Sequence, residues 1–131
     1  SNLQEMILVT SKNHNNEILK KLINKINFRK VVIMGSIGCK IASIVRGESN
    51  IYICLSLQGK SSPKDWDFAA PESILKGTGG AITNLDNEEL IYGQNGFEQS
   101  DIIVATSDKN THESICIEIK KIIEQNRIYP L

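Results

Sequence analysis

The sequence predicts an α/β layered domain with a five-stranded, mixed but largely parallel sheet flanked by helices. Short apolar runs rich in β-branched residues alternate with longer segments whose apolar residues recur at helical spacing. The strand candidates are apolar on both faces, as expected for strands that helices cover on two sides. A chain of 131 residues is long enough for one core of this kind, and it contains no internal repeat or low-complexity tract.

The first half of the chain supplies three strands and two helices in alternation. The predicted strands are residues 6–10 (MILVT), 30–34 (KVVIM) and 50–57 (NIYICLSL). In the first intervening segment, Ile18, Leu19, Leu22 and Ile23 fall on one helical face with lysines opposite. The second intervening segment turns sharply after its strand and is predicted to be a helix that closes at Gly47.

The second half of the chain completes the layers. It is interpreted, in order, as a helix over 65–80, a hairpin over 81–93 with its turn at Asp86-Asn87, a strand over 101–107 and an amphipathic helix over 110–126. Thr111, with Glu113 or Ser114, is the capping candidate of the last helix. His112 and Glu113 are interpreted as capping residues only, without a functional role.

Composition and cysteine usage exclude several classes of protein. Fifteen Lys and Arg balance fifteen Asp and Glu, which argues against binding a nucleic-acid polymer through bulk charge. No apolar run can cross a membrane and no signal-peptide pattern opens the chain. Cys39, Cys54 and Cys116 are widely spaced in apolar segments, which predicts reduced core thiols in a cytoplasmic protein rather than a zinc site. Ser1-Asn2 has the character of a tag remnant, so one domain is expected over residues 3–131.

A strand-to-helix turn at residues 34–40 (MGSIGCK) forms the first candidate site. Ser36 is placed to cap the helix, which leaves the amides of Ile37 and Gly38 as unpaired donors at its positive end, a natural phosphate cradle. Lys40 lies one turn further on the face of Ser36, so its ammonium can reach the same anion. A capped helix with one solvated lysine is the competing interpretation, and the residues alone favour it because a strand–Gly–Ser–helix turn is common.

His14 forms a second candidate site, in the polar segment at residues 10–16 (TSKNHNN) that follows the first strand. An imidazole at this position can hydrogen-bond a phosphate or stack near a base. A surface residue within a capping segment is the competing interpretation.

Asp65 and Asp67 flank Trp66 at the start of a helix and form the third candidate site. Capping explains a carboxylate at this position and is worth about 1 kcal/mol. A carboxylate is also a hard oxygen ligand of the kind that Mg²⁺ takes, so local physics leaves Asp67 undecided. Pro71 suits a first helical turn, where no amide has a partner to lose, and places the predicted helix start near residues 67–70.

The run WDFAAPESILKGTGG resembles the C-terminal signature of the inositol monophosphatase superfamily, Trp-Asp-x-Ala-Ala-Gly-x-x-Ile-x(4)-Gly-Gly. The matching residues are Trp66, Asp67, Ala69, Ala70, Ile74, Gly79 and Gly80, and Pro71 replaces the signature's first glycine. The Gly-Ser-x-x-x-Lys helix, the following strand with Tyr52, the SKNH segment and the closing ATS are most similar to the 3′(2′),5′-bisphosphate nucleotidase (CysQ-like) branch. In SKNH, Lys12 and Asn13 replace the branch's Arg and Ser. The resemblance covers nearly the whole chain, from about Met6 to the last helix.

The resemblance implies that the chain is the C-terminal half of a two-part phosphatase. The family's metals are held chiefly by a glutamate and an Asp-Pro-x-Asp-Gly-Thr motif of an N-terminal half, and this sequence contains no such motif. Asp67 is then the one Mg²⁺ ligand from this half, steadied by packing of Trp66, while Ala69 and Ala70 let the helix press on the sheet. No other catalytic residue is expected here, and the isolated domain is expected to be inactive.

The resemblance also implies a substrate and its contacts. It implies hydrolysis of 3′-phosphoadenosine 5′-phosphate to AMP and phosphate in sulfur-assimilation recycling, in the cytoplasm or peripheral to a bacterial inner membrane. The implied substrate-binding residues are Gly35, Ser36, Ile37, Gly38, Lys40, Ser11, Lys12 and His14. Within them, Lys40 would neutralise the phosphate that is not hydrolysed. The alternatives are an inositol-phosphate phosphatase of the same fold and a stand-alone, non-catalytic module that binds a phosphorylated ligand.

Overall fold

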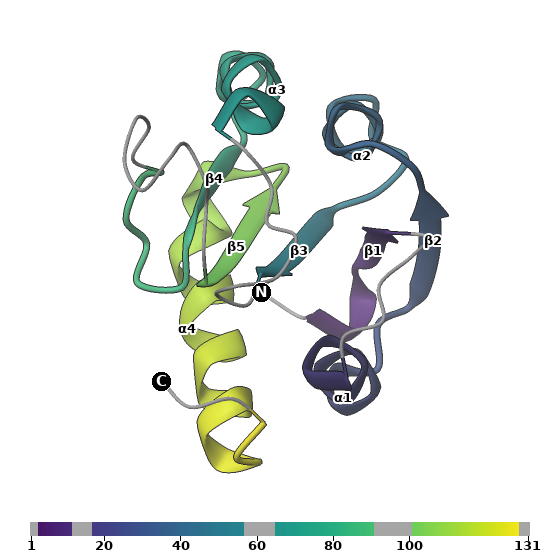
Figure 1. Ribbon diagram of the computed structural model, residues 1–131, viewed down its shortest axis with the longest axis vertical. Helices are drawn as coiled ribbons and strands as arrows, with labels where there is room; N and C mark the ends of the chain where they lie inside the picture. Colours follow the sequence, from purple (N-terminus) through teal and green to yellow (C-terminus); the bar gives the residue numbers. More distant parts are fainter. Residues whose placement is uncertain (1–2, 12–16, 57–64, 91–100, 129–131) are drawn as a thin grey trace.

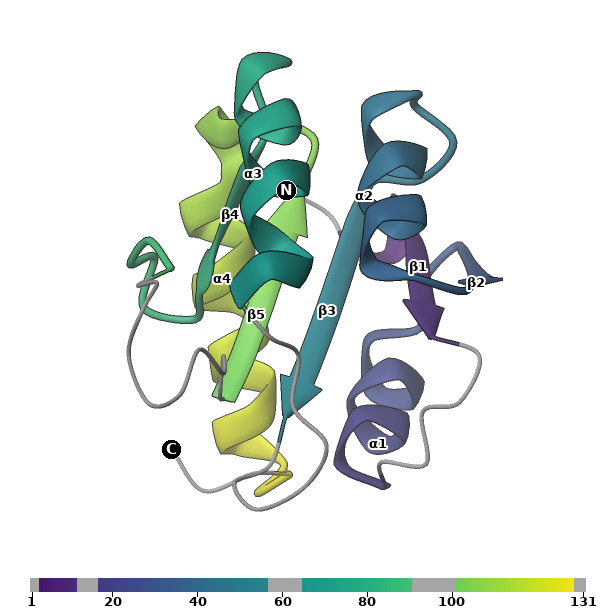
Figure 2. The same cartoon turned by 45° about the horizontal axis from the view of Figure 1, so that its top comes forward.

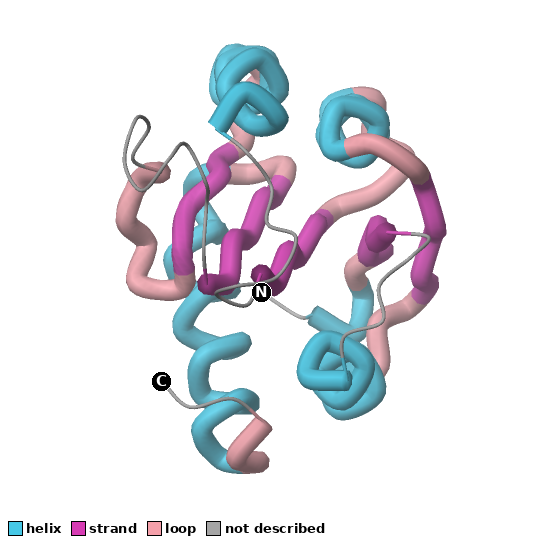
Figure 3. The backbone as a smooth tube through the Cα atoms, in the orientation of Figure 1, coloured by secondary structure: helices cyan, strands magenta, loops and turns pink. Residues whose placement is uncertain are grey.

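The computed structural model describes residues 3–11, 17–56, 65–90 and 101–128, and of residues 55–56, 65–67 and 101 the backbone alone (Figures 1 and 3). The elements are η1 (Leu3–Glu5), β1 (Ile7–Ser11), α1 (Glu17–Ile26), β2 (Lys30–Met34), α2 (Ile37–Val45), β3 (Ile51–Ser56), α3 (Asp65–Gly77), β4 (Ala81–Asn84), β5 (Asp101–Thr106) and α4 (Lys109–Gln125).

The strands form one five-stranded sheet in the order β2-β1-β3-β5-β4. β1 runs parallel to both of its neighbours, β2 and β3, whereas β5 runs antiparallel to β3 and to β4. The predicted α/β class and mixed five-stranded sheet are therefore confirmed. β2, β1 and β3 form the parallel half of the sheet. The helices that connect them, α1 and α2, carry the chain back so that each strand starts at the same edge.

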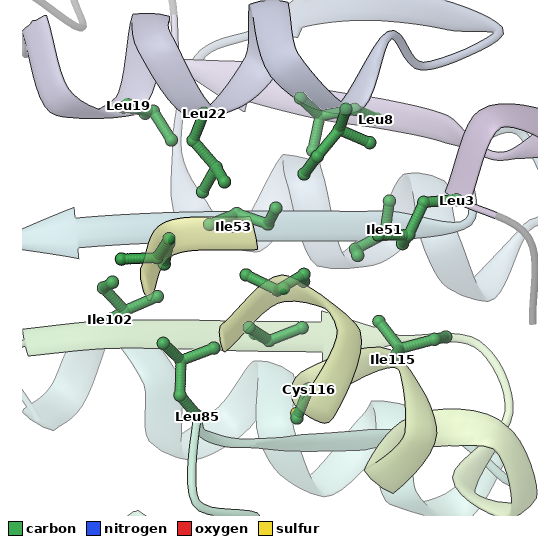
Figure 4. Close-up of a cluster of buried hydrophobic side chains, with 14 of the residues drawn as sticks. Leu3, Leu8, Leu19, Leu22, Ile51, Ile53, Leu85, Ile102, Ile115 and Cys116 are labelled. Carbon is green, nitrogen blue, oxygen red and sulfur yellow. The ribbon is translucent and has the colours of Figure 1, made fainter. Parts of the chain in front are cut away.

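Helices cover both faces of the sheet, with α1 and α4 on one face and α2 and α3 side by side on the other (Figures 1 and 2). Successive residues of β3 point alternately to the two helix layers. Ile51 and Ile53 pack with Leu19 and Leu22 of α1 on the first face (Figure 4). Tyr52 instead joins the cluster under α2 and α3. Each such aliphatic side chain contributes about 1.5–3 kcal/mol on burial, so the two clusters fix both helix layers.

The predicted element boundaries agree with the structure at most places. Gly47, just past α2, has a φ of 79°, which is the left-handed ending that glycine permits. The hairpin turn at Asp86-Asn87 is confirmed, because Asn87 has a φ of 60° and Thr83 bridges Glu89. The predicted start of α3 near residues 67–70 is wrong, since α3 begins at Asp65 and Pro71 lies inside it.

The capping prediction for the last helix is also wrong. Asp108 is the N-cap of α4, and its side chain accepts a hydrogen bond of 2.9 Å from the amide of Asn110. Thr111 and Glu113 lie within the helix, and Glu113 accepts a bond from the side chain of Asn87 instead. The helix therefore begins before all of the predicted cap candidates, because Asp108 has the extended backbone of an N-cap.

His112 is a buried core residue of α4 and not a capping residue. Its side chain is 1% exposed and lies between two threonine hydroxyls. Nε2 is 2.7 Å from Thr83 Oγ1 of β4, and Nδ1 is 2.7 Å from Thr106 Oγ1 of β5. The imidazole thus ties α4 to two strands, because both of its nitrogens are satisfied inside the core.

The cysteines are free thiols in three different environments. Cys116 is buried and Cys54 is half-buried, in line with the predicted core thiols, but Cys39 is exposed in the first turn of α2. The sequence misled here because Cys39 is one residue away from the inward-facing stripe of its helix. No described helix combines the length and apolar character needed to span a bilayer.

Candidate functional site

Three helices begin at one edge of the sheet. β1, β2 and β3 are parallel and lead into α1, α2 and α3, so the amino-terminal ends of these helices face the edge where the three strands end. β5 is antiparallel to β3, so α4 begins at the opposite edge. Of the segments singled out from the sequence, Ser11, residues 35–40 and the backbone of residues 65–67 fall at the first edge, where helix dipoles favour an anion.

The amino terminus of α2 has the predicted geometry of an anion cradle. Ser36 is the N-cap, and its Oγ accepts a hydrogen bond of 3.1 Å from the amide of Cys39. No described residue accepts a hydrogen bond from the amides of Ile37 and Gly38, so both are available to a ligand. A side-chain atom added at Gly35 would meet nothing within 4 Å, so this turn is open to an approaching group.

Lys40 occupies the inward face of α2 and is not a solvated lysine. Its side chain is 3% exposed, and its Nζ lies 5.1 Å from the centroid of the Tyr52 ring. Burial lowers the pKa of Lys40, and the neighbouring Cys54 and Cys39 partly oppose this shift. The simple alternative of a capped helix with a solvated lysine is therefore contradicted.

Ser11 is the last residue of β1 and is brought next to the α2 turn. Its Cα partner in the sheet is Met34, the residue before Gly35. Thr10, one residue earlier, is 1% exposed, and its Oγ1 has no hydrogen-bond partner. The predicted contacts of Lys12 and His14 lie outside the described residues.

Asp67 lies in the first turn of α3, at the same edge of the sheet as the α2 turn. The side chains of Asp67 and Trp66 lie outside the described residues, so their predicted roles stay predictions. Pro71 has no amide hydrogen, so the carbonyl of Asp67 receives no helical bond from that position. The expectation that Ala69 presses on the sheet is wrong, because this residue is exposed and Phe68 is buried in its place. Ala70 is likewise exposed.

The described residues do not form a metal site by themselves. Among them no group of three or more His, Cys, Asp or Glu side chains could hold a metal ion. Mg²⁺ requires several oxygen ligands, and Asp67 can supply only one carboxylate. A metal at this edge would therefore need most of its ligands from residues outside the described part of the chain.

Tyr52 and the burial of Lys40 are the features that the sequence argument missed. The signal was present in the helix, because Ile37, Lys40, Ile41 and Ile44 follow the i, i+3, i+4, i+7 spacing of an inward stripe. Tyr52 is the one aromatic residue of β3 and lies on the face that α2 covers. The two patterns together predict a buried ammonium beside an aromatic ring.

The family model described as "Inositol monophosphatase family" matches residues 2–124. A curated 3′(2′),5′-bisphosphate nucleotidase 1 from Mus musculus is 31% identical over 88 residues, which are 67% of this chain and 27% of the relative. A 3′(2′),5′-bisphosphate nucleotidase from Dictyostelium discoideum is 26% identical over 114 residues, 87% of this chain and 34% of the relative. The chain thus matches only a part of each curated relative.

Solved structures show the same fold. The inositol monophosphatase-II of Staphylococcus aureus (SaIMPase-II), bound to inositol monophosphate, matches with a TM-score of 0.70 and 24% identity over 98% of this chain and 46% of that chain. The 2′AMP-bound form of SaIMPase-II matches with a TM-score of 0.61 and 23% identity, covering 96% and 48% of the two chains. The mixed sheet and its helix layers are therefore those of the inositol monophosphatase fold.

Proposed function

The chain belongs to the inositol monophosphatase family, and from this premise we propose that it is the C-terminal α/β domain of a Mg²⁺-dependent phosphomonoesterase. The proposed reaction converts 3′-phosphoadenosine 5′-phosphate to AMP and phosphate, in cytoplasmic sulfur-assimilation recycling. The N-terminal half of the same protein is the proposed partner of this domain. The names of the curated relatives support a bisphosphate nucleotide as the substrate.

The observation that carries this proposal is the anion cradle of α2 with a buried cation behind it. Ser36 and the free amides of Ile37 and Gly38 suit one phosphate, and helix dipoles from the same edge add to its attraction. A second phosphate requires further positive charge, which Lys40 supplies one turn into the same helix. An inositol monophosphate has no second phosphate for this cation to neutralise.

The remaining site residues take the following proposed roles. Asp67 supplies the single carboxylate of this chain to Mg²⁺, Trp66 fixes its rotamer, and the other ligands come from the N-terminal half. The proposed contacts of the nucleotide and its phosphates are Gly35, Ser11, Lys12 and His14. Of these, Gly35 and Ser11 lie at the edge of the sheet where the three helices begin, which supports their proposed roles.

Two alternative functions compete with this proposal. An inositol-phosphate phosphatase of the same fold is supported by the inositol monophosphate that is bound in the SaIMPase-II structure. A non-catalytic module that binds a phosphorylated ligand is the second alternative. Coding sequence directly upstream of this chain, with an in-frame Asp-Pro-x-Asp-Gly-Thr motif, is expected for the enzyme. A start codon and ribosome site just before Leu3 would support the non-catalytic module instead.

The test of the proposed activity uses the full-length protein. Asp67→Asn is expected to abolish Mg²⁺-dependent phosphatase activity and to leave the circular dichroism spectrum unchanged. Lys40→Ala is expected to raise KM for the nucleotide bisphosphate far more than KM for inositol monophosphate. Lys121→Ala, an exposed lysine on α4, is the matched control and should change neither value.

The activities of the Asp67→Asn and Lys40→Ala variants distinguish the proposed nucleotidase from its alternatives. Near-wild-type turnover by Asp67→Asn would refute the ligand role. Equal KM effects of Lys40→Ala on the two substrates would show that Lys40 does not discriminate between them, and would favour the inositol-phosphate alternative.

A further inference from the structure

The ammonium of Lys40 is held in an apolar layer without a carboxylate partner among the described residues. It lies in the cluster that α2 and α3 form on the sheet, close to Ile41 and Ile44 of its own helix. Removing an ammonium from water strongly disfavours its charged form unless another group compensates. A charge that is needed at the site therefore requires a defined partner inside the fold.

The Tyr52 ring is the partner that the structure provides. The distance of 5.1 Å from Lys40 Nζ to the ring centroid is within the range of a cation–π interaction. Tyr52 is itself 3% exposed, so both the ring and the ammonium are shielded from water. Desolvated cation–π contacts of this kind are stronger than exposed ones. The ring stabilises the charged form of Lys40, because its face carries negative potential.

Tyr52 is also fixed in position. Its Cα pairs with Val9 of β1 and with Ala105 of β5, so it lies in the middle of the sheet with a strand on each side. Long helical side chains generally lean toward the amino terminus of their helix, which for Lys40 is the direction of the anion cradle of α2. A rigid ring and a helix terminus thus determine where the charge is located.

Cys54 lies two residues further along β3 and faces the same layer. Burial raises the pKa of the Cys54 thiol, so the thiol is a weak counter-ion and opposes the lowering of the Lys40 pKa only in part. Cys39 is exposed on the first turn of α2 and opposes the shift less than Cys54 does. Within the described residues the Tyr52 ring is the group in direct contact with the ammonium, whose Nζ lies 5.1 Å from the ring centroid.

We propose that Tyr52 is a positioning residue, which holds the Lys40 ammonium for the second phosphate of a nucleotide bisphosphate. The assignment rests on the proposed function of Lys40 and adds a residue to it. Tyr52 does not touch the substrate in this arrangement. It acts through Lys40, by keeping the ammonium charged and confined next to the α2 turn.

The first experiment tests the effect on recognition in the full-length phosphatase. Tyr52→Leu removes the ring and keeps an apolar side chain, whereas Tyr52→Phe keeps a ring. We expect Tyr52→Leu to raise KM for 3′-phosphoadenosine 5′-phosphate by roughly 5- to 30-fold, the equivalent of about 1–2 kcal/mol. KM for inositol monophosphate should change by less than about twofold, and Tyr52→Phe should restore most of the loss.

The control for lost packing is Phe28→Leu. Phe28 is a buried aromatic residue in the cluster under α1 and α4, on the other face of the sheet. This variant is expected to lower stability as Tyr52→Leu does, and to leave the ratio of the two KM values unchanged. An equal rise of both KM values in Tyr52→Leu, or no recovery in Tyr52→Phe, would overturn the proposal.

The second experiment does not depend on the proposed substrate. In the 131-residue chain with ¹³C-labelled lysine, one ε-methylene signal should be shifted upfield by the ring current of Tyr52. Lys40→Met should remove this signal, and Tyr52→Leu should move it back to the ordinary position and lower its midpoint of deprotonation. Equal KM effects of Lys40→Ala on the two substrates, with the shifted signal present in the unaltered chain, would refute the proposed function of Lys40 but keep the contact with Tyr52. An unshifted Lys40 signal in the unaltered chain would overturn the role of Tyr52 itself.

Discussion

Replacement of His112 by leucine is expected to destabilise the domain by about 2–4 kcal/mol. In the native structure the imidazole bonds Thr83 Oγ1 and Thr106 Oγ1, each at 2.7 Å. Without it, Thr106 keeps only a contact of 3.5 Å to the Asp108 carbonyl, while Thr83 still donates to the Asn84 carbonyl at 2.7 Å. A buried polar group left without a partner costs about 1–3 kcal/mol, so one full loss and one partial loss give the stated range.

The assay is urea denaturation of the chain, followed by far-ultraviolet circular dichroism, with the free energy of unfolding extrapolated to water. Adding Thr106→Val to His112→Leu provides the matched control. The double variant should recover about 1 kcal/mol or more, because replacing both partners by apolar groups removes the orphaned hydroxyl. A loss below about 0.5 kcal/mol in His112→Leu, or a double variant no more stable than the single one, would refute this account.

His112 also predicts how stability depends on pH. Burial lowers the pKa of His112 in the folded chain below the value of about 6.5 for an unfolded histidine. The unfolded state therefore binds the proton more readily, so the stabilisation is fully present above about pH 6.5 and is lost as the pH falls below it. The difference in unfolding free energy between the native chain and His112→Leu should shrink between about pH 7 and pH 5. A constant difference across this range would contradict the assignment.

Three further predictions concern single positions and metal. Gly80→Ala should cost about 1–3 kcal/mol in urea denaturation, because the added Cβ would lie 2.5 Å from Leu75 Cδ1 and 2.6 Å from the Thr106 carbonyl oxygen; an unchanged midpoint would count against this packing. Asp108→Ala should cost about 1 kcal/mol through loss of the cap bond to Asn110, whereas Asp108→Ser should retain most of it, and equal losses in the two variants would argue against capping. Millimolar Mg²⁺ should shift the Tm of the chain by less than about 1 °C, because the described residues contain no metal-binding group of side chains, and a larger rise would reveal a site.

The fold was predictable because its signals are local and repeated. The apolar runs of β1, β2 and β3 and the helical spacing of the intervening segments predicted the class and most boundaries. The direction of β5 was not predictable from its own residues. An apolar strand buried on both faces has the same composition whether it runs parallel or antiparallel to its neighbour.

The candidate site was predictable where backbone geometry decides it, as in the cap at Ser36. It was not predictable where tertiary packing decides. Lys40 was expected on the face of Ser36, but its burial against Tyr52 of a different element was not foreseen. His112 has the polar character of a helix start, and only the positions of Thr83 and Thr106 on two distant strands show that the core accommodates it.

The order of the strands has a consequence for folding during synthesis. β1, β2 and β3 follow one another closely in the chain and are adjacent in the sheet, so they can associate while the rest of the protein is still being made. β4 is different, because its neighbour in the sheet is β5, which pairs with β3 across roughly fifty residues of chain. Until residues 101–106 leave the ribosome, β4 lacks its neighbouring strand, and the face of the sheet that α4 later covers stays incomplete. Nascent chains that end before β5 are therefore expected to expose the apolar face of β3 to chaperones.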